Sequence, residues 1–275
     1  MIKEKQAQIR TFQTWLKKTD FITTFWHSAA YLALSQNVVW YSDEMWNGWK
    51  EADTGHWFLP PRARTFYNNK QMAEIGLSIR IGWPQTSPPD ENMKLFDHQY
   101  YYRSDAFTED LLGSRWSVFR KNVRKYSART KGELTYREIR TNELDDAGSL
   151  VLQWGKGRTI YDPETFVGFV VCDDLPDVYR KGLWCDNKLV GVNVWDKALD
   201  GTWIYRICID NGSPFLQEYL RHQFYLDMTR THGACWINDG GDLGNKGLAA
   251  FKRKLRPHSV LSIPTINIDE PTETI

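Results

Sequence analysis

Three aspartates in the C-terminal third of the 275-residue chain are candidate catalytic carboxylates. Asp210 stands at the end of a strand predicted over 202–209, and Asp239 and Asp242 follow a short apolar strand predicted over 234–238. A carboxylate in such a place can accept a proton from a reacting hydroxyl or amine. Aspartates before a helix are also typical caps, and both Asp210 and Asp242 precede predicted helices. The catalytic and the capping interpretations are both open.

Two clusters of basic residues are candidate phosphate-binding sites. The clusters consist of Arg115, Arg120, Lys121, Arg124 and Lys125, and of Lys246, Lys252, Arg253, Lys254 and Arg256. Arginine forks match the geometry of phosphate oxygens. The alternative is a solvated helix face, which is the usual role of a charge run. The formal net charge of +1 argues against generic coating of nucleic acid but allows local phosphate sites.

The composition is that of a globular protein, with 41% hydrophobic and 25% charged residues. No apolar run approaches the roughly 20 residues of a membrane span, and residues 1–18 hold no apolar core of a signal peptide, which favours a cytoplasmic location. The spacings of Cys172, Cys185, Cys208 and Cys235 include no CxxC pair and favour buried, reduced thiols. The histidines show no ligand spacing, so no metal site is predicted.

Alternating strands and helices must position these residues. Strands are predicted over 99–103, 133–140, 182–185, 189–195, 202–209, 234–238 and 260–268, and helices over 108–126, 144–154, 215–231 and 243–255. Asp186–Asn187 and Asp200–Gly201 predict hairpin turns that need positive φ. The order predicts an α/β sheet in which a helix joins two neighbouring strands. A doubly wound nucleotide fold is excluded because the chain has no GxGxxG.

The N-terminal third gives weaker signals. Residues 5–36 are predicted to be helical with a break near Asp20, strands are predicted over 37–42 and 56–59, and a helix over 68–81. A proline-rich loop around 83–92 separates this part from the remainder.

Two stretches resemble the C-terminal domain family of the phosphatidylglycerol lysyltransferases. The first consists of Tyr100–Ser104, Leu111–Arg115 and Arg120–Tyr126, and the second of Ile237–Leu248, Phe251–Lys252 and Leu255–Pro257. The chain departs from the family pattern at Asp239-Gly240, where the family has Arg-Glu, and at Arg256, where it has tyrosine.

This resemblance implies a GNAT-like acyltransferase fold of α/β (α+β) class, in two tandem lobes with mixed central sheets. Residues 1–95 would form a degenerate N-terminal lobe and residues 96–275 the catalytic lobe. The implied reaction moves an acyl group from aminoacyl-tRNA to an amine or hydroxyl by direct attack, with the tRNA 3′ end as partner and no tightly bound cofactor. Acyl-CoA is the alternative donor, although 210–214 lacks the glycines that hold CoA. A nucleobase-modifying enzyme acting on DNA or RNA and a non-catalytic binding module are further alternatives.

The resemblance also implies site residues. The candidate catalytic residues are Asp210, Asp239 and Asp242. The candidate substrate-binding residues are Arg115, Arg120, Asn122, Arg124, Tyr205, Asn238, Lys252 and Arg256. Backbone N–H groups near 209–212 are expected to polarise the donor carbonyl. Tyr205 is also a candidate for the core.

Overall fold

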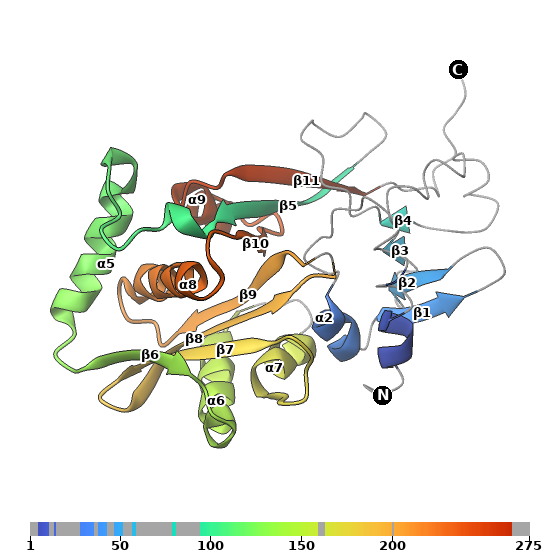
Figure 1. The fold of residues 1–275 in the computed structure, drawn as a ribbon, viewed down its shortest axis with the longest axis horizontal. Coiled ribbons are helices and arrows are strands. Elements are labelled where there is room, and N and C mark those ends of the chain that lie inside the picture. Colours follow the sequence, from blue (N-terminus) through green and yellow to red (C-terminus); the bar gives the residue numbers. More distant parts are fainter. Residues whose placement is uncertain are drawn as a thin grey trace.

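The computed structural model describes residues 5–10, 14, 28–35, 38–42, 47–51, 57–58, 79–80, 94–158, 163–199 and 201–265. Its main feature is a seven-stranded sheet in the order β11-β5-β10-β9-β8-β7-β6 (Figure 1). The strands are β5 (Lys94–Arg103), β6 (Leu134–Glu138), β7 (Tyr179–Cys185), β8 (Lys188–Lys197), β9 (Trp203–Asp210), β10 (Trp236–Gly241) and β11 (Ser259–Thr265). The pairing of β9 with β10 is parallel, and the other neighbouring pairs of this sheet are antiparallel.

Helices cover both faces of this sheet (Figure 1). They are α5 (Ser117–Arg129), α6 (Leu144–Gly155), α7 (Pro163–Val171), α8 (Leu216–His232) and α9 (Lys246–Lys254). Side chains of β8 and β9 point into two cores: Val192 and Ile207 pack with α6 and α7, whereas Tyr205, on the other side of a β-bulge in β9, packs with α8. The sheet is therefore buried on both sides, as the predicted α/β arrangement requires.

A second sheet lies N-terminal to the first. It consists of β1 (Val38–Ser42), β2 (Asn47–Glu51), β3 (Trp57–Phe58) and β4 (Ile79–Arg80), preceded by α2 (Ala29–Leu34). The helix predicted over 68–81 was wrong at Ile79–Arg80, which pair with β3, and its other residues lie outside the described part of the chain. The break predicted near Asp20 and the turn residue Asp200 also lie outside it. The lobe boundary at 95/96 stays a prediction.

Helix α5 illustrates how the sequence builds the site. Its apolar stripe Trp116, Phe119, Val123 and Tyr126 is buried, as the three- and four-residue spacing predicted. The helix begins at Ser117 and not near residue 108, because Leu111 (φ 47°) and Gly113 (φ 93°) turn the chain out of helical geometry. Helix α7 was not predicted.

The two parallel strands separate soon after they pair. Ile237 and Asn238 of β10 pair with Trp203 and Ile204 of β9, and no further pair joins these strands. Beyond Ile204 the main chain of β9 finds other partners on this edge: the Cys208 carbonyl accepts a hydrogen bond from Gln217 Nε2 at 2.9 Å. The two strands therefore diverge beyond this pair, beside α8.

Candidate functional site

A buried ion cluster fills the point where β9 and β10 diverge. Asp239 pairs through Oδ2 with Arg221 of α8, and its Oδ1 lies 3.5 Å from Lys252 Nζ of α9. Lys252 also donates to the Asp239 carbonyl oxygen, and Tyr225 Oη donates to Oδ2 at 3.3 Å. Because cations and a hydroxyl already hold Asp239, its carboxylate is not free to take a proton from a substrate.

Lys252 is a buried residue of the cluster and not part of a solvated basic face. Its side chain is 5% exposed, and burial lowers the pKa of its ammonium group, although Asp239 acts in the opposite direction. The sequence grouped Lys252 with its exposed neighbours; the structure separates it from Arg253 and Arg256, which are exposed. As placed, Lys252 does not reach a phosphate in solvent.

Asp242 occupies a second buried position, three residues after Asp239 and directly after β10. Its Oδ2 accepts a hydrogen bond from Tyr100 Oη at 2.5 Å and lies 3.7 Å from His98 Nδ1. Its Oδ1 accepts from Gly244 N at 3.0 Å. The half-buried His98 connects this carboxylate to the surface. The cap of α9 is Asn245, which accepts from Leu248 N, so the expectation that Asp242 caps this helix was wrong.

Asp97 and Gly241 fix the chain around Asp242. Asp97 Oδ1 accepts from the N–H groups of Asp242 and Leu243 at 3.0 and 2.8 Å. A Cβ at position 241 would lie 1.5 Å from Asp97 Oδ2, so the close approach requires glycine. Residues 239–241 belong to β10, which corrects the prediction of a loop after residue 238.

Asp210 lies apart from these acids, at the far end of β9. Its Oδ1 accepts from Gly212 N at 2.8 Å, which confirms the turn-capping interpretation. The carboxyl is half-buried, and burial raises its pKa; the Gly212 N–H and the charge of Arg158 oppose this shift, and Glu218 adds to it. Of the three candidate aspartates, Asp210 is the partly exposed one.

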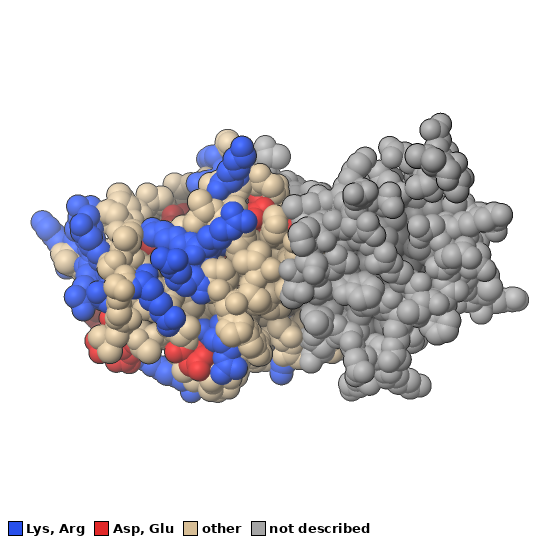
Figure 2. Space-filling view, turned by 90° about the horizontal axis from the view of Figure 1, so that it is seen from above, with Lys and Arg blue, Asp and Glu red and all other residues tan. Residues whose placement is uncertain are grey.

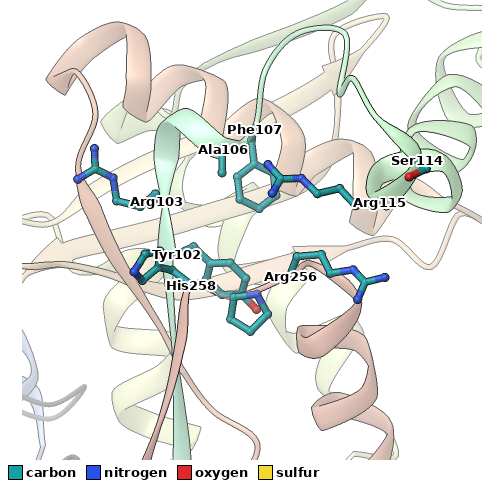
Figure 3. A pocket seen from close by; sticks show the side chains of 9 residues that line it. Tyr102, Arg103, Ala106, Phe107, Ser114, Arg115, Arg256 and His258 are labelled. Atoms are coloured by element: carbon teal, nitrogen blue, oxygen red, sulfur yellow. The ribbon is translucent and has the colours of Figure 1, made fainter. Parts of the chain in front are cut away.

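The structure brings Arg115 and Arg256 together. They line a pocket of about 610 Å³ between the end of β5, the segment before α5 and the segment after α9 (Figure 3). The remaining lining residues are Tyr102, Arg103, Ala106, Phe107, Ser114, Pro257 and His258. The two stretches that carried the family resemblance thus meet at one pocket.

A separate, basic groove of about 440 Å³ lies along α5. Its lining residues are Ser117, Arg120, Lys121, Arg124, Lys125 and Ala128. At the far end of α5, Lys125 and Arg129 lie 4.9 and 5.1 Å from the ring of Phe215, which begins α8 after the Asp210 turn. Figure 2 shows lysine and arginine side chains gathered on the part of the molecule that carries α5 and α9.

Several candidate binding residues have partners inside the protein. Arg120 donates to the carbonyls of Leu111 and Gly113, and therefore positions the segment that carries Arg115. Asn122 donates to Glu218 Oε1 at 2.8 Å and links α5 to α8. Arg124, in contrast, is exposed in the groove.

Tyr205 and Asn238 are buried. Tyr205 stacks on Phe224 at 3.9 Å and donates to Asn193 Oδ1, so it belongs to the core. Asn238 donates to Gln99 Oε1 at 2.8 Å and to Tyr101 Oη at 3.1 Å. Its neighbour Asp239 faces α8, so successive residues of β10 serve opposite faces of the sheet.

Residues that sequence reasoning missed complete these arrangements. Arg221, Tyr225, Glu218 and His98 carry no motif of their own, and only the packing of α8 and β5 reveals them. The four cysteines are free and half-buried. Within the described ranges, no three His, Cys, Asp or Glu side chains gather as metal ligands.

Comparisons with known proteins place this architecture. No family description and no curated protein matches the sequence. A conserved protein of unknown function from Bacteroides thetaiotaomicron has a similar solved structure, with a TM-score of 0.71, 13% identity, and 95% of this chain and 97% of that chain covered. A lysylphosphatidylglycerol synthetase structure (L-PGS) from Bacillus licheniformis matches with a TM-score of 0.62 at 12% identity, over 96% of this chain and 93% of that chain.

The C-terminal domain (DUF2156) of an Agrobacterium fabrum protein named for lysylphosphatidylglycerol synthetase gives a TM-score of 0.61 at 13% identity, covering 95% and 92% of the two chains. The chain has the fold of these synthetase structures. The predicted α/β class with a mixed sheet, and the resemblance stated from the two motif stretches, are confirmed at the level of the fold. Among the residues that the structure describes, no helix is long and apolar enough to cross a membrane.

Proposed function

We propose that the chain is an acyltransferase whose donor is an aminoacyl-tRNA. The observation that carries this proposal is the basic groove along α5, whose lining starts two residues after Arg115 and reaches Lys125, which lies against Phe215 at the start of α8. In a chain of net charge +1, this concentration of arginine and lysine suits an extended polyanion. The similarity in fold to the synthetase structures supports the same reaction class.

Asp210 is the proposed general base. It takes the proton of the acceptor amine or hydroxyl while the acceptor attacks the ester carbonyl of the donor. A new bond forms between the acceptor and the carbonyl carbon, the bond from that carbon to the ribose oxygen breaks, and the proton passes to the leaving oxygen. A raised pKa suits this role, because it makes the carboxylate a stronger base toward the acceptor proton.

The oxyanion needs donors other than those expected from the sequence. Asn211 N donates to the Val190 carbonyl, Gly212 N to Asp210, and Ser213 N to the Asn211 side chain, so these N–H groups are already engaged. Arg158, whose charge partly opposes the rise in the pKa of Asp210, is the proposed cation that stabilises the oxyanion.

The same turn favours tRNA over CoA as donor. Phosphate-binding turns present free backbone N–H groups at a helix N-terminus. Here Gly212 and Ser213 use theirs within the turn, and the first turn of α8 carries the acidic Glu218. The start of α8 is therefore a poor pyrophosphate cradle.

A donor comparison tests the proposal. Purified protein is mixed with radiolabelled aminoacyl-tRNAs or with labelled acetyl-CoA, and hydroxylamine serves as a small surrogate acceptor, with protein-free reactions as background. We expect transfer above background from at least one aminoacyl-tRNA, with none from acetyl-CoA, and loss of transfer in Asp210→Asn. Asp174→Asn removes an exposed charge before β7, at the end of the sheet opposite Asp210, and should transfer like wild type. Transfer from acetyl-CoA alone would show that acyl-CoA, and not aminoacyl-tRNA, is the donor. Absence of transfer from every donor tested would favour a non-catalytic binding module.

A further inference from the structure

The pocket of Arg115 and Arg256 has the charge of an anion site. Arg103, a third arginine of the lining, is paired with Asp105 at 3.2 Å, and in Figure 3 its guanidinium points away from the pocket centre. Arg115 reaches toward Phe107, and Arg256 lies below it on the segment after α9 (Figure 3). No ion pair joins Arg115 or Arg256 to an acidic side chain among the described residues, so the pocket is lined by two arginines whose charges are not neutralised by a carboxylate.

The chain holds both arginines in place at some cost. Arg120 donates hydrogen bonds to the carbonyl oxygens of Leu111 and Gly113, and these bonds fix the segment that carries Arg115. Arg256 has a φ of 56°, a conformation that suits glycine and disfavours a long side chain. Glycine adopts a positive φ at the end of a helix at lower free energy than arginine does, so Arg256 stands in a backbone conformation that disfavours its residue type.

The pocket lies far from Asp210. Arg103 pairs with Trp236 at the start of β10, and Ile237 pairs with Trp203 at the start of β9, whereas Asp210 ends β9. An extended strand from Trp203 to Asp210 spans roughly 23 Å. A ligand that fills the pocket therefore holds its donor ester elsewhere.

Helix α5 connects the two places. It has 13 residues, which corresponds to a length of about 20 Å. Arg115 precedes its first residue at the pocket, and Lys125 and Arg129 near its last turn contact Phe215 next to the Asp210 turn. A strand of RNA that lies along α5 would reach from one to the other.

We infer that the Arg115–Arg256 pocket binds a phosphate group, and that it anchors a backbone phosphate of the donor RNA about one α5 length from the reacting ester. This inference rests on the proposed function for the identity of the donor. The pocket itself recognises phosphate, which CoA or free phosphate would also supply.

Fluorescence anisotropy with a labelled single-stranded RNA ending in CCA tests the inference across a salt series. The variants are Arg115→Gln and Arg256→Gly. The second removes the guanidinium and eases the positive φ, so a loss of binding cannot come from a strained fold. Each should weaken RNA binding roughly tenfold and lower the slope of log K against log salt by about 0.7. Arg140→Gln, at an exposed position beyond the end of β6 and outside the pocket and groove, should leave the affinity and the slope unchanged.

Competition separates the sources of phosphate. Unlabelled RNA should displace the probe from wild type, whereas CoA and inorganic phosphate should do so only at far higher concentrations. Displacement by CoA or inorganic phosphate as readily as by RNA would overturn the RNA assignment. Wild-type affinity and salt slope in both arginine variants would overturn the pocket assignment, even with transfer activity intact. RNA binding that depends on both arginines without any transfer would instead contradict the proposed function and leave the pocket standing.

Discussion

Asp239 of β10 and Arg221 of α8 form a buried ion pair at the point where the parallel strands β9 and β10 diverge. The two side chains are 3% and 7% exposed. The guanidinium of Arg221 lies 5.0 Å from the Tyr205 ring on β9 and 5.2 Å from the Phe251 ring on α9. Arg221 of α8 therefore contacts β9, β10 and α9, and its pair with Asp239 stabilises the arrangement of the two diverging strands.

Asp239→Asn should destabilise the fold by about 3–5 kcal/mol, because it leaves Arg221 and Lys252 buried without their carboxylate. Arg221→Met should cost less, since Lys252 still compensates Asp239. Urea unfolding of the two variants measures the difference. Equal, small losses in both would contradict the central place of Asp239 in this cluster.

Asp210→Asn should lower transfer about 10²–10⁴-fold, the usual contribution of a general base. The same substitution should increase the stability of the fold at neutral pH. Burial raises the pKa of Asp210 in the folded state, so folding favours the protonated form, and the ionised carboxylate weakens the fold as pH rises through the folded pKa. Asp210→Asn should therefore raise the melting temperature at pH 7.

The stabilisation by Asp210→Asn should shrink as pH falls toward the ordinary aspartate pKa near 4, where Asp210 itself becomes protonated in both states. Scanning calorimetry of wild type and variant at several pH values measures this. A melting temperature that drops at neutral pH would show that the carboxylate supports the turn more than it prepares for chemistry.

Gly241→Ala should destabilise the chain by about 1–3 kcal/mol, because the new Cβ would displace Asp97. Asp97 would then lose its hydrogen bonds to the N–H groups of Asp242 and Leu243. In Asp97→Ala the space is already open, so adding Gly241→Ala should cost much less there than in wild type. A double-mutant cycle by chemical unfolding gives the coupling, and strict additivity would refute the packing argument.

Arg120→Met should weaken RNA binding through Arg115 and not through a direct contact. Arg120 holds the carbonyls of Leu111 and Gly113, which shape the segment before α5. The double variant Arg120→Met/Arg115→Gln should bind RNA about as well as Arg115→Gln alone. Anisotropy at one salt concentration compares the variants; additive losses would make Arg120 an independent phosphate ligand.

Local signals predicted much of the fold. The apolar spacing of α5 and the Asp186-Asn187 turn, with φ of 47° and 65°, depend on neighbours in sequence and were found where expected. The start of α5 and the extent of β10 were misplaced, because Leu111, Gly113 and the Asp97 contact with Gly241 act through conformations and partners that periodicity does not reveal.

The site was harder to predict, because it depends on contacts between distant segments. Lys252 and Arg253 are adjacent in sequence, yet one is buried against Asp239 and the other is exposed. Asp210 and Asp239 both end or follow predicted strands, but β9 and β10 pair over two residues only and then separate. The meeting of Arg115 with Arg256 follows from the packing of α9 against β5, which no local pattern encodes.

The rate at which a labelled aminoacyl group leaves tRNA in a single turnover, with protein in excess and hydroxylamine as acceptor, tests the central claim most directly. Wild type should accelerate the loss above the protein-free rate, Asp210→Asn should abolish the acceleration at saturating protein, and Arg115→Gln should need more protein to reach the wild-type rate. An Asp210→Asn rate equal to wild type at every protein concentration would contradict the account.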